Sequence, residues 1–137
     1  MTPEADRFLA KARKHLEDAA KMLDIGLMEA AGRTAYLAGF HAAQAFIFES
    51  IGKIFKSHNG VQTEFLRLTK ADSRFTTDHR IFLSQTYNLK TIADYETGAS
   101  AEISVERAAF AIEAGDRFVA HIAELLTPDQ PERSADS

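Results

Sequence analysis

The chain has 137 residues but no cysteine, no tryptophan and only three prolines. The absence of cysteine excludes disulfide bonds and thiolate metal sites, and it fits the reducing environment of the cytoplasm. No apolar stretch is long enough to cross a bilayer, and the charged N-terminal segment lacks the apolar centre of a signal peptide. We therefore expect a cytoplasmic protein that does not contact membranes.

Charge is distributed unevenly along the chain, although the net charge is only −4. Residues 51–93 carry seven Lys or Arg against three Asp or Glu, whereas residues 94–137 carry three against ten. The positive middle third favours an anionic partner such as a nucleotide or RNA, and solvated helix faces are the alternative interpretation.

Strand patterns are nearly absent, and apolar residues recur at the three- and four-residue spacing of helices. We predict an all-α fold, an antiparallel up-and-down bundle of four long helices plus one short helix over residues 1–127, with a flexible tail at residues 128–137. The first helix is expected to start at Thr2-Pro3 and to stop at Gly26, and the second to run from Met28 to Phe55, closed by a turn at Asn59-Gly60. A short helix is expected within residues 61–70. The fourth helix should run from an N-cap at Asp78 to Tyr95, and the last from a cap at Ser104 to Pro128.

The second helix has an unusual distribution of side chains around its axis. Its large apolar side contains Leu37, Phe40 and Ile47, but the opposite side carries small residues where a surface helix would carry Lys and Glu. These small residues predict a homodimer whose interface lies at or near Ala35, Ala38, Gly39 and Ala42. In the alternative interpretation, the other helices of the same chain cover this side.

Four residues, Arg33, Tyr36, His41 and Gln44, stand out at the start of the uncharged run of this helix and within it, because they are types that bind other groups. Arg33 lies on the large apolar side and needs a partner, for which the first candidates are Asp94 or a Glu of the last helix. Tyr36 can bury its ring while its hydroxyl reaches a polar group. His41 lies at the border between the two sides, a position more typical of a hydrogen-bonded core residue than of a ligand or a base.

Three motifs in order give the chain a family resemblance. The first motif is "GRTAYLAGFHAAQAFIFES", the second is "KSHNGVQTEF", and the third is a basic residue followed by Asp-Tyr. Together they resemble the HEPN family (higher eukaryotes and prokaryotes nucleotide-binding domain), in its branch of small stand-alone prokaryotic bundles. The matching positions are Arg33, Tyr36, Phe40-His41, Ala42-Ala43, Lys56, His58, Gly60, Val61, Phe65, Lys90 and Asp94-Tyr95.

The resemblance implies a bundle that usually dimerises, and many members pair with a small nucleotidyltransferase, often as a toxin–antitoxin couple. Active members are metal-independent ribonucleases with an Arg, a gap of four to six residues and a His. Here the only such pair is Arg74 and His79 in "RFTTDH", with Phe75 where active members commonly carry a polar residue. We interpret this pair as accidental spacing rather than as an active site.

We therefore expect a non-enzymatic, dimeric HEPN bundle that binds a nucleotide or RNA, or a nucleotidyltransferase partner. It needs no cofactor and no metal, because the sequence has neither a Gly-rich phosphate loop nor a metal-ligand spacing. The alternatives are a ribonuclease toxin that uses Arg74 and His79, and a purely structural interaction module. The candidate ligand-binding residues are Arg33, Tyr36, His41, Lys56, His58, Lys90, Asp94 and Tyr95.

Some of these candidates also have purely structural interpretations. Lys56 and His58 can complement the dipole of the preceding helix at its C-terminus. Asp94 and Tyr95 can form a hydrogen-bonded pair that holds the fourth helix to Arg33. The structure decides which side chains lie together.

Overall fold

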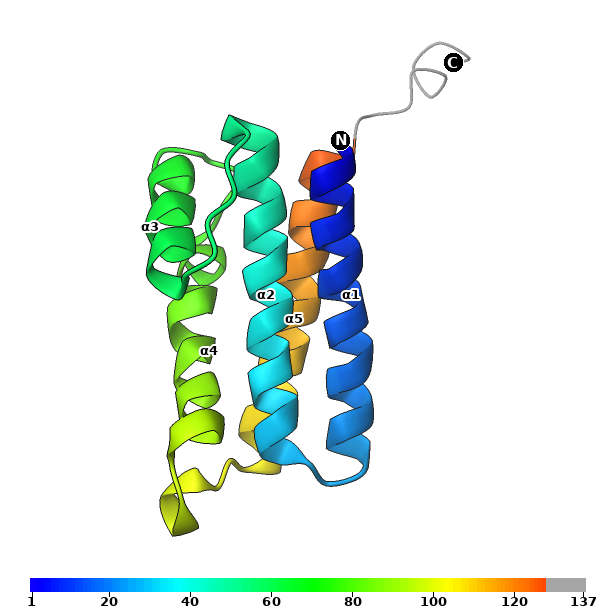
Figure 1. The fold of residues 1–137 in the computed structure, drawn as a ribbon, viewed down its shortest axis with the longest axis vertical. Helices are drawn as coiled ribbons and strands as arrows, with labels where there is room; N and C mark the ends of the chain where they lie inside the picture. The colour runs from blue at the N-terminus through cyan, green and yellow to red at the C-terminus, as the bar shows by residue number, and fades with distance from the viewer. Residues whose placement is uncertain (128–137) are drawn as a thin grey trace.

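Four of the five α-helices within residues 1–127 begin after a Thr or Ser whose hydroxyl accepts a backbone N–H group of the first turn. The computed structural model describes residues 1–127, and the tail expected at residues 128–137 lies outside them. The elements are α1 (Pro3–Asp24), α2 (Met28–Ile51), α3 (His58–Thr69), α4 (Thr77–Tyr95), the 3₁₀ turn η1 (Gly98–Ala101) and α5 (Val105–Leu126). This order confirms the all-α bundle of four long helices and one short helix (Figure 1).

Two of the expected caps are present, and one is shifted. The Thr2 hydroxyl accepts the Ala5 N–H at 3.1 Å, and the Ser104 hydroxyl accepts the Arg107 N–H at 3.1 Å. Helix α4 begins two residues earlier than an Asp78 cap would allow, because Thr76 is its N-cap. Asp78 lies instead in the first turn, where its charge complements the helix dipole.

Helix α2 ends at Ile51, four residues before the expected end at Phe55. Gly52 adopts φ +69° at the C-cap, a left-handed conformation that glycine reaches without steric cost. The segment of residues 52–57 then runs down beside α2 to the start of α3 (Figure 1). Ser57 caps α3, and its hydroxyl accepts the Gly60 N–H at 2.9 Å. The predicted turn at Asn59-Gly60 is therefore wrong, since both residues belong to the first turn of α3.

Helix α2 is the central element, and it packs against α1, α3, α4 and α5 (Figure 1). Ala35, Ala38 and Ala42 are fully buried within one chain. A Cβ atom at Gly39 would lie 2.1 Å from Cε2 of Phe82 on α4. The helices of the same chain thus cover the small-residue side, so the interface expected at Ala35, Ala38, Gly39 and Ala42 is wrong. The small residues allow the helices of one chain to pack closely. The homodimer remains a prediction, and its interface must lie on another surface.

Phenylalanine rings fill the space on the α4 and α5 side of α2. Phe82 stacks on Phe118 with ring centroids 4.8 Å apart, and Phe46, Phe65 and Phe75 meet edge to face. Within residues 1–127, no helix combines the length and apolar content needed to cross a membrane.

Candidate functional site

A hollow of about 240 Å³ opens between α2, α4 and the segment that leads into α3. We call it the α2–α4 cleft, and its lining residues are Tyr36, Leu37, Phe40, Lys56, His58, Tyr87 and Lys90. Four of the ligand-binding candidates expected from the sequence are among them, although they come from three separate parts of the chain. The fold therefore gathers cations and aromatic rings into one cleft.

A hydrogen-bonded pair of rings forms the floor of the cleft. The Tyr36 hydroxyl lies 2.7 Å from Nδ1 of His58, and the His58 ring stacks on Tyr87 with centroids 3.7 Å apart. Burial, with a smaller effect of Tyr87, raises the pKa of Tyr36, so its phenol keeps the proton. Burial also lowers the pKa of His58, a hydrogen bond with Gln62 opposes this, and Lys90 lowers it further. A neutral His58 thus accepts the hydrogen bond that Tyr36 donates, which fixes the ring against Tyr87.

A cluster of charged groups adjoins the cleft at Lys90. Asp94 accepts one hydrogen bond from Nε of Arg33 at 2.8 Å and another from Nζ of Lys90 at 2.6 Å. The Lys90 bond, followed by the Arg33 bond, lowers the pKa of Asp94 and keeps it ionised. The expected Arg33–Asp94 pair thus joins α2 to α4. One carboxylate faces two cations, and the exposed Lys56 adds a third cation to the lining of the cleft, so these groups together carry a net positive charge.

The rings of two tyrosines flank Lys90. Its ammonium lies 5.9 Å from the centroid of Tyr87 and 5.6 Å from that of Tyr95, within cation–π range. Tyr95 is 73% exposed, so it is not part of a buried hydrogen-bonding pair with Asp94. Its open face is available for stacking. Sequence reasoning missed Tyr87, although its spacing of three residues from Lys90 places both on one face of α4.

His41 lies beside the cleft rather than in it. Its Nδ1 is 2.7 Å from Oε1 of Gln44, and Nε2 of Gln44 donates to the Phe55 carbonyl at 2.7 Å. Gln44 is only 5% exposed, so this chain of hydrogen bonds ties the segment carrying Lys56 to α2. His41 therefore has the satisfied, partly buried position that its sequence context indicated, and Gln44, for which the sequence indicated no partner, is a positioning residue.

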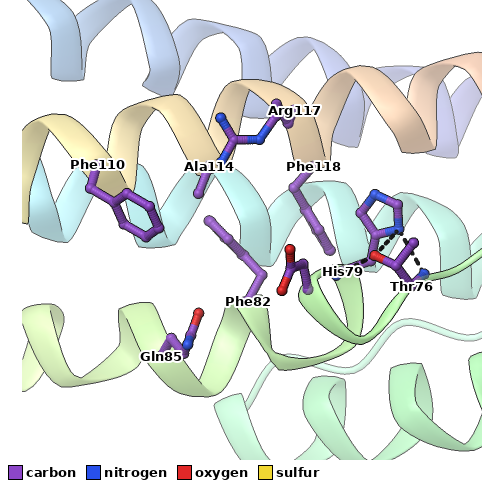
Figure 2. Close-up of a pocket in the computed structure, with 9 residues that line it drawn as sticks. Thr76, His79, Phe82, Gln85, Phe110, Ala114, Arg117 and Phe118 are labelled. Atoms are coloured by element: carbon purple, nitrogen blue, oxygen red, sulfur yellow. Dashed lines mark hydrogen bonds between the residues drawn. The ribbon is translucent and has the colours of Figure 1, made fainter.

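A longer groove runs between α4 and α5. Two adjoining hollows, of about 330 Å³ and about 510 Å³, share Phe82, Gln85, Phe110 and Ala114 and together define the α4–α5 groove. Figure 2 shows the first hollow, with Arg117 of α5 above Phe82 and Phe118 and with His79 of α4 to their right.

The side chains of Arg74 and His79 bind different partners in the structure. The Arg74 guanidinium binds both carboxylate oxygens of Asp72, at 2.9 Å and 2.7 Å, and this pairing lowers the pKa of Asp72 to about 2. Nδ1 of His79 accepts the Thr76 N–H at 3.0 Å in the capping box (Figure 2), and its ring stacks on His121 with centroids 4.0 Å apart. Within one chain these side chains do not form the pair that the ribonuclease alternative requires.

The fold and the cleft define a class of small helical bundles with a basic, aromatic cleft beside a central helix. The family model described as "HEPN domain" matches residues 5–125. A protein of Archaeoglobus fulgidus named "UPF0332 protein" is 30% identical over 116 residues, which cover 85% of this chain and 90% of that protein. The chain therefore belongs to the HEPN domain family.

A solved structure has a similar fold. The crystal structure of TT1696 from Thermus thermophilus superimposes with a TM-score of 0.78 at 19% identity, covering 91% of this chain and all of that one. At this identity the likeness concerns the fold alone.

Proposed function

We propose that this HEPN protein is a non-enzymatic bundle that binds a nucleotide or RNA in the α2–α4 cleft. The observation that carries the proposal is the convergence of Lys56, His58 and Lys90 with the rings of Tyr87 and Tyr95. Lysines attract phosphate groups, and an open tyrosine ring stacks on a base without regard to its identity. Asp94 is already neutralised by Arg33 and Lys90, so it does not cancel the attraction of Lys56.

The proposal predicts that Lys56→Glu weakens binding of a uridine oligonucleotide about tenfold and lowers the slope of the salt dependence by about 0.7. The matched control is Lys70→Glu, which makes the same change in net charge at an exposed position outside the cleft. Fluorescence anisotropy of a labelled oligonucleotide at several salt concentrations measures both effects. Equal losses in the two variants would show that net charge, and not the cleft, controls binding.

We also propose that the chain forms the expected homodimer through the α4–α5 groove. Phe110 is 60% exposed and stands directly beside an apolar hollow that contains Phe82, Leu89 and Ala114. In a two-fold contact, each Phe110 can enter the hollow of the other copy, because such a contact uses the same patch twice. Exposed apolar patches of this kind often mark interfaces.

The nucleotidyltransferase partner and the toxin–antitoxin role belong to the same proposal, and family membership supports them. Co-purification with a nucleotidyltransferase encoded beside this chain tests that pairing. The ribonuclease alternative now requires a second copy of the chain to place an Arg beside His79, because one chain does not form that pair. Cleavage of an RNA pool by the wild type and not by His79→Ala would establish it.

A further inference from the structure

The aromatic residues of the α2–α4 cleft continue across α2 onto α1. The ring centroids of Tyr36 and Phe40 are 5.9 Å apart, and those of Phe40 and His41 are 5.6 Å apart. His41 then stacks on His15 at 5.3 Å and, at 6.5 Å, on Phe8. All of these rings except Tyr36 are partly exposed, so they form a ridge on the surface of the bundle.

A second hollow of about 240 Å³ lies at the far side of this ridge. It is lined by Glu4, Arg7, Phe8, Lys11 and Ile54. Arg7 and Lys11 are exposed, and the pair of cations outnumbers the single carboxylate. The segment of residues 52–57 links the two hollows, since it provides Ile54 to this one and Lys56 to the α2–α4 cleft.

The charges around the ridge are predominantly positive. Burial lowers the pKa of His15, and the positive charge of Lys11 lowers it further. Asp18 raises this pKa, whereas Arg33 and Lys14 have smaller lowering effects. Asp18 itself is bound to Lys14 at 2.9 Å, which leaves Lys11 without a carboxylate partner in residues 1–127. The two hollows are thus joined by rings and bordered by cations on both sides.

We infer that this face, from Lys11 across Phe40 and His41 to Lys90, binds a single-stranded nucleic acid several nucleotides long. A single nucleotide can occupy only one hollow, whereas a strand can place phosphates near the cations of both and stack bases on the ridge between them. Aromatic platforms interleaved with basic residues are the usual means of binding single strands, because unpaired bases expose their faces. A duplex hides those faces and gains nothing from the ridge. The inference rests on the proposed function of the α2–α4 cleft, which it extends from a nucleotide site to a strand-binding surface.

The experiment compares uridine monophosphate, uridine oligonucleotides of increasing length up to about ten nucleotides, oligo(dT) and a duplex of equal length. Affinity should rise steeply with length and exceed that for the duplex. Lys11→Glu should weaken binding of the longest strand about tenfold and reduce its salt slope by about 0.7, but leave the monophosphate affinity unchanged. The control, Arg13→Glu, changes the same charge on the opposite face of α1 and should have little effect.

The possible outcomes separate the two proposals. If the monophosphate binds and longer strands bind no more tightly, the strand surface is excluded while the nucleotide site stands. If neither binds, both proposals fail. Equal affinity for the duplex would contradict single-strand recognition, and a difference between oligo(U) and oligo(dT) would show whether RNA or DNA is the preferred strand.

Discussion

Gly39→Leu is expected to lower the free energy of unfolding by about 3 kcal/mol or more, because Phe82 already occupies the space of a side chain at this position. The glycine approaches that ring so closely that even a Cβ would lie 2.1 Å from Cε2. Phe82 cannot move away easily, since it is 3% exposed and stacked on Phe118. Small domains are stable by only about 5–15 kcal/mol, so the variant should lose a large part of its stability. Urea unfolding followed by circular dichroism measures the loss.

A double-mutant cycle separates overpacking from a general effect of leucine in this helix. Phe82→Ala alone should be destabilising because it leaves a cavity, by about 3–5 kcal/mol. In the combined Gly39→Leu, Phe82→Ala variant, the new side chain fills part of that cavity, so the loss should be smaller than the sum of the two single losses. Additive losses would mean that Gly39 does not set the distance between α2 and α4.

Phe110→Asp is expected to weaken the proposed dimer by at least about 30-fold, the effect of removing a central aromatic anchor from an interface. The residue is 60% exposed in the single chain, so the substitution should leave folding nearly unchanged. Equilibrium sedimentation over a range of concentrations measures the dissociation constant. The matched control is Ile25→Asp, which places the same charge at another exposed apolar residue, 73% exposed, between α1 and α2.

The two variants give a clear comparison. A wild type that dimerises, an Ile25→Asp variant that also does so and a monomeric Phe110→Asp variant would support the α4–α5 groove as the interface. A wild type that stays monomeric at high concentration, or a Phe110→Asp variant that dimerises as tightly as the wild type, would contradict it.

Features determined by neighbouring residues were predictable from the sequence. Thr2 and Ser104 act as caps because their hydroxyls need only reach N–H groups three residues ahead. The pairing of Arg33 with Asp94 followed only in part, since an Arg on an apolar helix side needs a carboxylate but the sequence left Asp94 and a Glu of the last helix as candidates. The end of α2 was harder, because Gly52 and Asn59-Gly60 both carry a helix stop signal, and Ser57 decides between them by starting α3.

What packs against a buried face was not predictable. The small residues around Ala38 correctly indicate that this side of α2 is covered, but periodicity does not say whether the cover comes from the same chain or from another. The role of His79 was not predictable either. His79 is the third residue of α4 and closes a capping box with Thr76, where the common sequence signature has Glu or Gln. Tyr87 was missed because its importance comes from stacking on His58, a residue on another helix.

The measurement that tests the central claim most directly is a titration followed by NMR of the histidine ring protons. The five histidines report on separate places: His58 in the α2–α4 cleft, His15 and His41 on the aromatic ridge, and His79 and His121 beside the α4–α5 groove. On addition of a uridine oligonucleotide, we predict that His58, His41 and His15 shift while His79 and His121 do not. Shifts at His79 and His121 with His58 unchanged would contradict the account and place the nucleic-acid site in the α4–α5 groove.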